Sequence, residues 1–313
     1  MTMQHHWKLT WVSVIAATIV SLPFCEDAVS QTAPRGELKT MTLGLISSVH
    51  QQEIETHFAD FIDYVAKRLS AGGDVKAKVV VAANVVSLVK MLEQKEVDFY
   101  LESPYPTYII NNVHGAGKLL LRRWKSGMSE YRSLIFTKKD SSLSRLQDLR
   151  GKIVAFEDPE STSGYFLPKF FLQRNGFKLV EKTPGNAAVS AAEIGYVFIS
   201  SLDGLIESVL SGKVAAATFS DDDFASLAES KKAGLAILAQ TELLPRHLVS
   251  VRKDLTPEWV ERLGLVLLGM NEDDQGRRIM LQADNTTKFD PLPGGEEVMR
   301  RRLLETFHAP DKR

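Results

Sequence analysis

The sequence predicts an α/β fold in which mainly parallel sheets carry helices on both faces. Short apolar segments rich in β-branched residues alternate along the 313-residue chain with segments whose apolar residues recur at helical spacing. Polar or glycine-containing turns separate these segments. A chain of this length is expected to form two compact units or one split unit.

Residues 1–30 predict a secretory signal peptide. Lys8 precedes an apolar run from Leu9 to Phe24, and Ala28-Val29-Ser30 offers a small-residue cleavage site. The run falls short of the ~20 residues that a membrane span needs, and no basic cluster follows it. We expect export with cleavage, rather than a retained anchor or a lipoprotein attached through Cys25.

Predicted strands and helices begin to alternate in the part of the chain that follows the signal peptide. In the predicted helix 54–69, the apolar side chains Phe58, Phe61, Ile62, Val65 and Leu69 lie on one face. The predicted strands are 40–46, 76–82, 97–101 and 118–124, and the other predicted helices are 85–94 and 107–112.

A new unit is predicted to begin near Ser126. Gly176 and Gly212 are suited to end two of its helices. Its predicted strands are 131–138, 152–156, 196–199, 214–219 and 235–239, and its predicted helices are 146–149, 165–175, 202–210 and 224–232.

The last part of the chain, from residue 248, has a different order of elements, with one predicted strand followed by three predicted helices. Thr256 and Pro257 are typical of the N-cap and first position of a helix. The predicted strand is 248–252, and the predicted helices are 257–268, 273–281 and 296–307.

Composition excludes several function classes. The net charge of −1 gives no general field for nucleic acid or acidic lipid, so neither is expected as a partner. The single cysteine excludes a disulfide framework. We find no nucleophile elbow, phosphate-binding loop, dinucleotide motif or paired metal-binding histidines, so we expect no catalytic residues, no metal and no cofactor.

The most informative segment joins strand 152–156 to the next helix. Ser161, Thr162 and Ser163 place three hydroxyls at the helix start, and Gly164 keeps the backbone there bare. The first backbone N–H groups of a helix lack partners, and the helix dipole favours an anion at this end. Ordinary helix capping is the alternative explanation.

Ligands of parallel sheets bind beyond the carboxyl ends of the strands. This rule adds four candidate residues: Ser48 and His50 after the first strand, Tyr105 after the third, and Tyr165 after Ser163. His50 could equally be a solvated loop residue, and Tyr105 could pack in the core.

Acidic residues follow two of the same strands. Glu102 would repel an anion, and could instead pair with an amine of a zwitterionic ligand or cap the turn. Asp221 and Asp222 would accept a hydrogen bond from a protonated oxyanion, which favours phosphorus oxyanions over sulfate. Capping of helix 224–232 is the alternative for this acidic run.

The segment EDPESTSGYFLP (157–168) resembles the motif of substrate-binding proteins of phosphate, phosphite and phosphonate ABC importers. Further similar segments follow in the family's order over about Leu43–Leu268: YRSLIFTKKDS with LQDLRGK, SVLSGKVAAATFSDDD, and LAQTELLPRHLVSVRKDLTPE. The family often carries a histidine where this chain reads Phe198-Ile199-Ser200-Ser201, so Ser200 or Ser201 would replace it as a donor.

The resemblance implies a type II periplasmic-binding-protein fold with a small anionic solute bound between two lobes. Lobe 1 would comprise 38–128 and 242–313, and lobe 2 would comprise 129–241, joined near 126–130 and 238–242. It further implies a monomer in the periplasm that delivers its ligand to a membrane permease. Another solute on the same fold (a sulfonate, nitrate, a thiamine-like precursor or ferric ion) and a sensory role remain alternatives.

Overall fold

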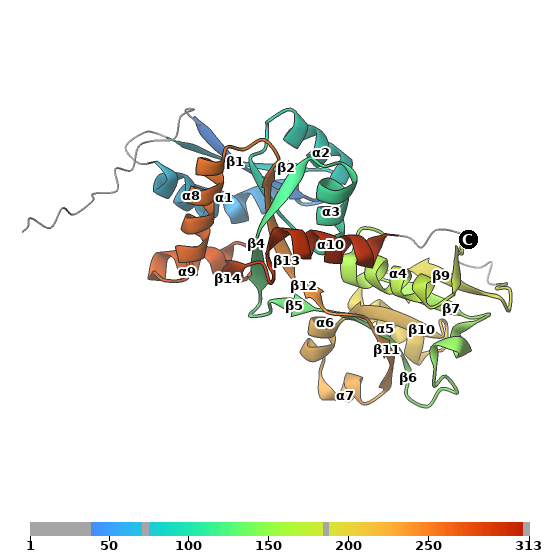
Figure 1. Cartoon of the computed structure of the whole chain (residues 1–313). Helices are drawn as coiled ribbons and strands as arrows, with labels where there is room; N and C mark the ends of the chain where they lie inside the picture. The colour runs from blue at the N-terminus through green and yellow to red at the C-terminus, as the bar shows by residue number, and fades with distance from the viewer. Residues whose placement is uncertain (1–38, 71–74, 184–187, 309–313) are drawn as a thin grey trace, which may run out of the picture. The chain divides into compact units, whose positions relative to one another are not determined.

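The computed structural model describes residues 39–70, 75–183 and 188–308 (Figure 1). The predicted signal peptide, 1–30, lies outside these residues. The strands form two six-stranded sheets and a separate two-stranded ladder. Among the described residues, none of the helices has the length and apolar character needed to cross a bilayer.

The first sheet has the strand order β14-β4-β13-β3-β1-β2. Its strands are β1 (Thr40–Ile46), β2 (Lys76–Ala82), β3 (Phe99–Glu102), β4 (Gly117–Lys125), β13 (His247–Arg252) and β14 (Thr286–Pro291). Pairing is parallel in β3-β1-β2 and antiparallel in β14-β4-β13-β3. The antiparallel pairs arise because β13 and β14, from the far end of the chain, run against their neighbours.

Helices pack against this sheet. They are α1 (Gln51–Leu69), α2 (Val85–Glu93), α3 (Pro104–Tyr108), α8 (Pro257–Gly269), α9 (Asp274–Gln282) and α10 (Gly295–Phe307), with a π-helical turn at Ile109–Val113. The predicted apolar face of α1 is buried, and it packs with Trp259 and Leu263 of α8 in the largest core cluster. Helix α1 begins three residues earlier than predicted, directly after His50, which adopts a left-handed backbone conformation.

The second sheet has the order β11-β6-β10-β7-β9-β8. Its strands are β6 (Ser133–Lys138), β7 (Ile153–Phe156), β8 (Lys178–Glu181), β9 (Glu193–Phe198), β10 (Ala216–Ser220) and β11 (Leu235–Gln240). Pairing is parallel in β10-β7-β9-β8 and antiparallel in β11-β6-β10. The parallel half directs the ends of β7 and β10 toward one edge of the sheet.

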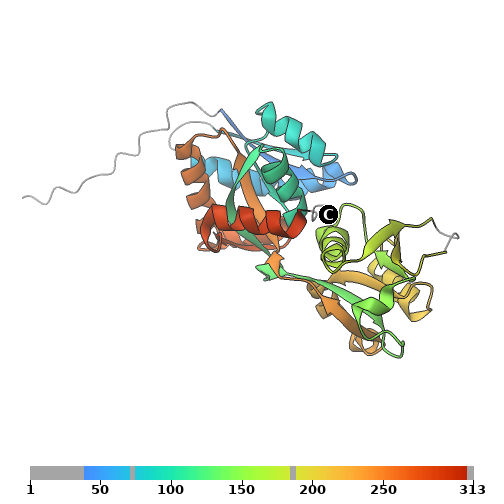
Figure 2. The same cartoon turned by 45° about the vertical axis from the view of Figure 1, so that its right-hand side comes forward.

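The second sheet carries its own helices, among them α4 (Figure 2). The regular helices are α4 (Leu167–Arg174), α5 (Leu202–Leu210), α6 (Asp221–Ser226) and α7 (Glu229–Lys232); a 3-10 turn spans Leu146–Leu149 and a π-helical turn spans Thr162–Phe166. The helix expected over 224–232 is thus two short helices with a break at Leu227 and Ala228.

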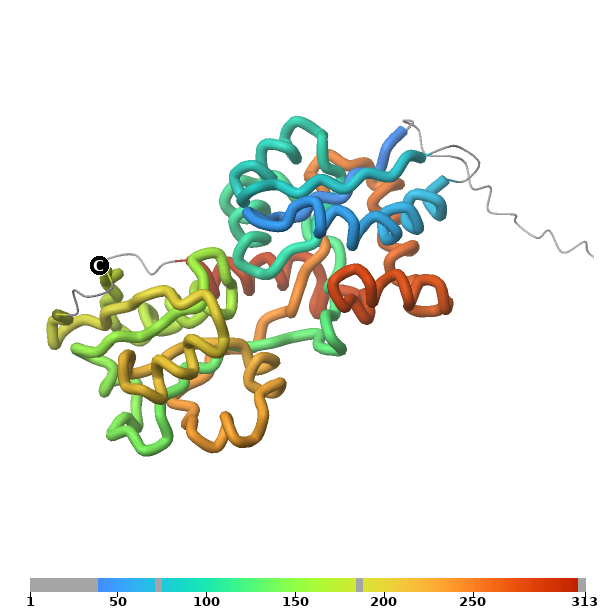
Figure 3. The backbone as a smooth tube through the Cα atoms, turned by 180° about the vertical axis from the view of Figure 1, so that it is seen from behind, coloured from blue at the N-terminus to red at the C-terminus, as the bar shows by residue number. Residues whose placement is uncertain are grey.

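The chain passes twice between the two sheets, and the two passages are paired. Strand β5 (Glu130–Tyr131) lies antiparallel to β12 (Leu244–Pro245), and the tube trace shows the green and orange segments side by side (Figure 3). Because β11 extends to Gln240, the second passage falls later in the chain than the predicted 238–242.

Candidate functional site

Strand ends from both sheets meet at a small polar cavity of about 270 Å³, which we call the hydroxyl pocket. Ser103 follows β3, the three hydroxyl residues 161–163 follow β7, and Ser220 ends β10. The full lining is Ser103, Tyr131, Glu157, Glu160, Ser161, Thr162, Ser163, Ser220, Asp223, Arg246 and His247. The predicted motif therefore lies in a cavity at the carboxyl ends of strands, as the general rule for such sheets expects.

Ser161 uses its side chain as a cap. Its Oγ accepts a hydrogen bond from the backbone N–H of Gly164 at 2.9 Å and donates to Glu157 Oε2 at 3.2 Å. A Cβ on Gly164 would lie 2.4 Å from that same carboxylate oxygen. The close approach of Glu157 therefore requires glycine at position 164. From the sequence, we expected Gly164 to leave the backbone bare for a ligand.

Thr162 is 3% exposed and links the motif to the segment after β3. Its Oγ1 lies 2.9 Å from Ser103 Oγ and accepts a hydrogen bond from the backbone N–H of Tyr105 at 3.2 Å. One hydroxyl therefore holds together two of the strand ends that line the pocket.

Tyr131 of β5 contributes a phenol to the pocket that the sequence did not reveal. Burial raises the pKa of this phenol well above its usual range, and the positive charge of Arg246 only partly opposes the shift. The phenol therefore stays protonated at neutral pH and can act as a hydrogen-bond donor.

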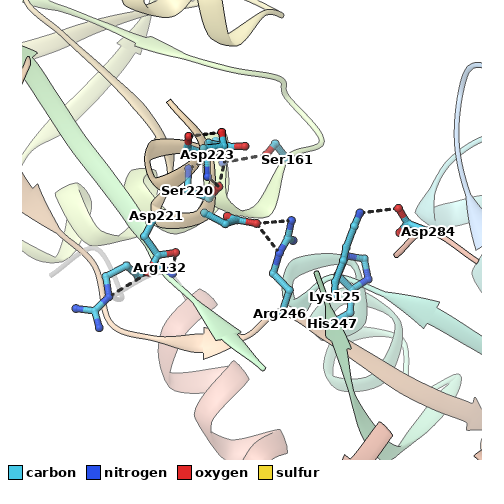
Figure 4. A network of polar contacts seen from close by, with 12 residues as sticks. Lys125, Arg132, Ser161, Ser220, Asp221, Asp223, Arg246, His247 and Asp284 are labelled. Atoms are coloured by element: carbon cyan, nitrogen blue, oxygen red, sulfur yellow. Dashed lines mark hydrogen bonds and ion pairs between the residues drawn. The ribbon is translucent and has the colours of Figure 1, made fainter. Parts of the chain in front are cut away.

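Arg246, directly before β13, supplies the cation of the pocket (Figure 4). Its Nε and Nη2 lie 3.1 Å and 3.0 Å from the same Oδ2 atom of Asp222. The guanidinium also lies 4.6 Å from the centre of the Tyr131 ring. Asp222 Oδ1 is buried and has no hydrogen-bond partner in the described part of the chain.

His247 lines the pocket as a neutral imidazole. Its Nδ1 lies 3.3 Å from Nη1 of Arg123, which is a donor only, so Nδ1 accepts and the ring proton lies on Nε2. Burial, together with Arg123, Arg246 and Lys125, lowers the pKa of His247 well below its usual range. The uncharged Nε2–H group is consequently a second donor for an anion.

The acidic run Asp221–Asp223 divides its roles. Asp221, the predicted ligand residue, accepts a hydrogen bond from the Arg132 backbone N–H at 3.1 Å and lies outside the pocket lining (Figure 4). Asp223 lines the pocket and forms a capping box with Ser220 at the start of α6. The capping box thus accounts for the interactions of the Asp223 carboxylate, and the hydrogen bond from Arg132 accounts for those of Asp221.

Both predicted tyrosines are packed among aromatic rings. Tyr105 stacks on Phe166 with 3.4 Å between ring centroids, and Phe307 lies edge-on to it. Tyr165 is buried beside Tyr196, and its hydroxyl accepts a hydrogen bond from Lys169 Nζ at 2.7 Å. Neither ring belongs to the pocket lining, so the structure favours the packing alternative for Tyr105, and Tyr165 lies in the core.

The remaining predicted residues lie on exposed loops outside the lining. Ser48 is exposed after β1, and the exposed His50 has its Nδ1 atom 3.6 Å from a carboxylate oxygen of Glu53. Ser200 is exposed directly before Ser201, whose hydroxyl caps α5. Of the ten predicted ligand residues, the pocket lining contains Ser161, Thr162 and Ser163, and Gly164 forms the backbone behind Glu157.

The described residues contain no group of three or more His, Cys, Asp or Glu side chains that could hold a metal ion. The polar groups that line the pocket are hydroxyls, a phenol, an imidazole N–H, a guanidinium and carboxylates. This set is suited to bind an oxyanion by hydrogen bonds, with one positive charge close by.

Comparisons with known proteins agree with this chemistry. The model of a family described as ABC transporter, phosphonate, periplasmic substrate-binding protein matches residues 43–293. The phosphate-import protein PhnD of Mycolicibacterium smegmatis is 23% identical over 271 residues, which span 84% of this chain and 82% of that protein.

Two solved structures share the fold. XAC2383 from Xanthomonas citri, solved with ATP, matches with a TM-score of 0.77 and 25% identity over 87% of this chain and 96% of that chain. PhnD1 from Prochlorococcus marinus, solved with methylphosphonate, matches with a TM-score of 0.59 and 18% identity over 86% and 97%. The chain therefore belongs to the family of periplasmic substrate-binding proteins of phosphonate ABC transporters.

Proposed function

We propose that this protein binds a phosphorus oxyanion group, as a phosphonate, phosphite or phosphate, in the hydroxyl pocket and delivers it to the permease of an ABC importer. The observation that carries the proposal is the convergence of Ser163, Tyr131, Arg246 and His247 on one cavity with the Ser161–Thr162 turn. Binding makes and breaks no bond. Affinity comes from preorganised donors that replace the hydration of the anion.

The acidic side chains in the pocket favour a ligand that still carries a proton. Glu157, which accepts a hydrogen bond from the Ser161 hydroxyl, lines the pocket. A carboxylate there can accept a hydrogen bond from a P–OH group, whereas sulfate has no proton to donate. The role first expected for Asp221 thus falls to Glu157.

We further propose that the two sheets define two lobes, 38–128 with 242–313 and 129–241. The β5–β12 ladder would be the hinge, and closure would bury the ligand between the lobes. The signal peptide over 1–30, release into the periplasm and a monomeric state are parts of the same proposal.

The test is titration calorimetry and thermal shift on ligand-free protein with phosphate, phosphite, methylphosphonate and sulfate. A phosphorus oxyanion should raise the melting temperature by mass action, and sulfate should not. Ser163→Ala should weaken binding by about tenfold, whereas Ser200→Ala, outside the lining, should not change it. An equal response to sulfate, or no response to any phosphorus oxyanion, would contradict the proposal.

A phosphorylated nucleotide is a second candidate ligand, because XAC2383, with a TM-score of 0.77, was solved with ATP. A nucleotide would present its terminal phosphoryl group to the same donors. Including ATP in the titration, with adenosine as the control, separates this candidate from the small oxyanions.

A further inference from the structure

A second cavity, of about 380 Å³, lies at the edge of the second sheet where β7 and β10 begin and β6 ends. We call it the lysine pocket. Its volume falls within the range of small-molecule sites in proteins. The lining comprises Thr137, Lys138, Ser141, Ser142, Leu143, Gly151, Lys152, Ile153, Val209, Gly212, Lys213, Val214 and Ala215.

The charge of the lysine pocket has one sign. Lys138, Lys152 and Lys213 are exposed, and among the described residues their ammonium groups form no ion pair, whereas other lysines of the chain do. No described carboxylate lines the cavity, and Asp140, in the turn after β6, stays outside the lining. Since the whole chain has 38 basic and 39 acidic side chains, this local excess of positive charge is not a general property of the protein.

Hydroxyl groups lie beside the lysines. Thr137 Oγ1 donates to the carbonyl of Ala215 at 2.8 Å, so in its 3.1 Å contact with Ser141 Oγ the serine is the donor. The exposed hydroxyl of Ser142, in contrast, has no hydrogen-bond partner among the described residues. The pocket therefore offers three ammonium groups and one hydroxyl that the protein itself does not use.

The inner wall of the lysine pocket is apolar. Val209 and Val214 are buried in the core cluster of the second sheet, and Ile153 packs against the same cluster. Leu143 is half-buried against the neighbouring cluster. A ligand that filled the cavity would thus bury apolar atoms against these side chains while its charged end met the lysines.

The lysine pocket is separate from the hydroxyl pocket. Strand β10, which is 5 residues long, leads from Ala215 of the lysine pocket to Ser220 of the hydroxyl pocket. The rise of a β-strand places the two cavities about 16 Å apart, at opposite edges of one sheet. A small ligand in one cavity therefore does not reach the other.

We propose that the lysine pocket binds a small organic anion, with its carboxylate, sulfonate or phosphate head group among the three lysines and a short apolar chain against Val209 and Val214. Such an anion relieves the mutual repulsion of three like charges. Because the apolar surface lies inside a cavity of about 380 Å³, a small molecule fits it and the surface of a bilayer does not. The two pockets share no residue, so this inference is independent of the proposed function.

The experiment titrates ¹⁵N-labelled protein with hexanoate and follows the backbone amide shifts. Hexanoate has an anionic head and an apolar chain, and it lacks the P–OH proton that the hydroxyl pocket favours. The amides of Gly151, Gly212 and Lys213 should shift along a saturable curve, and those of residues 161–164 should not. Acetate, which lacks the chain, and hexanol, which lacks the charge, should each bind at least about tenfold more weakly.

Variants of the lysines test the head-group contacts. Replacing Lys138, Lys152 and Lys213 together by glutamine should weaken hexanoate binding at least about tenfold, and their exposure makes a loss of folding unexpected. The matched control changes the net charge equally at three exposed lysines of α1, β2 and α2 and should leave the affinity unchanged; it comprises Lys67→Gln, Lys76→Gln and Lys90→Gln.

Four outcomes would overturn the inference. They are equal affinities of hexanoate and hexanol, equal losses of affinity in the two triple variants, and amide shifts confined to the hydroxyl pocket. The fourth is co-sedimentation of the protein with phosphatidylglycerol vesicles in the absence of hexanoate binding, because the lysines would then serve a membrane surface. Hexanoate binding at the lysine pocket would uphold the inference even if no phosphorus oxyanion bound to the protein.

Discussion

The hydroxyl oxygens of Ser103 and Thr162 lie 2.9 Å apart, and this contact joins the segment after β3 of the first sheet to the turn after β7 of the second. The Tyr105 backbone N–H shares the Thr162 oxygen as acceptor. The Ser103 hydroxyl and the Tyr105 backbone N–H thus both depend on one buried side-chain atom, Thr162 Oγ1, as their hydrogen-bond partner.

Replacing Thr162 by valine should lower the stability of the protein. Valine keeps the volume but removes the oxygen, so Ser103 and the Tyr105 N–H lose a partner, and the free energy of unfolding should fall by about 1–3 kcal/mol. Urea denaturation measures the change. Thr56→Val on the exposed face of α1 is the control. Equal losses of stability in the two variants would contradict the role of Thr162 Oγ1 as a buried hydrogen-bond partner.

Removing Arg246 should destabilise the protein through Asp222. In Arg246→Met, the Asp222 carboxylate keeps its negative charge in a partly buried place without the guanidinium, and stability should fall by about 1–3 kcal/mol. The double variant Arg246→Met with Asp222→Asn should recover most of the loss. Denaturation of both, with exposed Arg278→Met as the control, tests this; a double variant as unstable as the single one would refute it.

Stability should depend on Glu102 between pH 4.5 and 7. Burial raises its pKa from 4.5 to about 7 on folding, so the native state holds the proton more tightly than the unfolded state. This stabilisation is complete below pH 4.5 and is lost as the pH rises through 7. Glu102→Gln should therefore be more stable than the native protein at pH 8, by about 1–3 kcal/mol, and the gap should close toward pH 5. A stability difference between Glu102→Gln and the native protein that did not vary with pH would show that ionisation of Glu102 is not its cause.

His247 should remain an uncharged Nε2–H tautomer across the physiological pH range. The Arg123 donor at Nδ1 and the surrounding cations both oppose protonation. Two-dimensional ¹H–¹⁵N spectra of histidine side chains between pH 5.5 and 8 report tautomer and charge directly. Titration of the His247 signals in that range, or a proton on Nδ1, would contradict the geometry.

Tyr105 should act through packing with Phe166 and not through its hydroxyl. Tyr105→Phe should leave oxyanion affinity unchanged, because the phenol lies outside the lining. A double-mutant cycle of Tyr105→Ala and Phe166→Ala should give a coupling of about 0.5–1.5 kcal/mol in stability. The pair Tyr105→Ala and Phe224→Ala, whose rings belong to different clusters, should show none.

The sequence allowed most elements to be predicted because their periodicity is strong. Strands β1 and β2 and helix α5 match their predicted bounds. Strand β14 was missed because Thr286–Pro291 is mostly polar, and β8 because it is a short edge strand with charged ends. Their places depend on pairing with distant strands, which local composition does not encode.

The site was predictable where one segment carries it. The Ser161–Ser163 turn was identified because its hydroxyls are consecutive and precede a helix. Tyr131, Arg246 and His247 were missed because they lie in the two passages between the sheets or directly after them, and only the fold brings these segments together. For the acidic run, Ser220 and Asp223 already have the spacing of a capping box, a local signal that could have separated Asp223 from Asp221.

The order of strands in the two sheets has a consequence for biosynthesis. All strands of the second sheet come from one continuous stretch, 133–240, whereas the first sheet needs β13 and β14 from beyond it. During translation β4 therefore has neither of its neighbours until the second sheet has been synthesised. The nascent chain thus exposes the open edges of β3 and β4 for that whole interval, which is when a chaperone would be most useful to it.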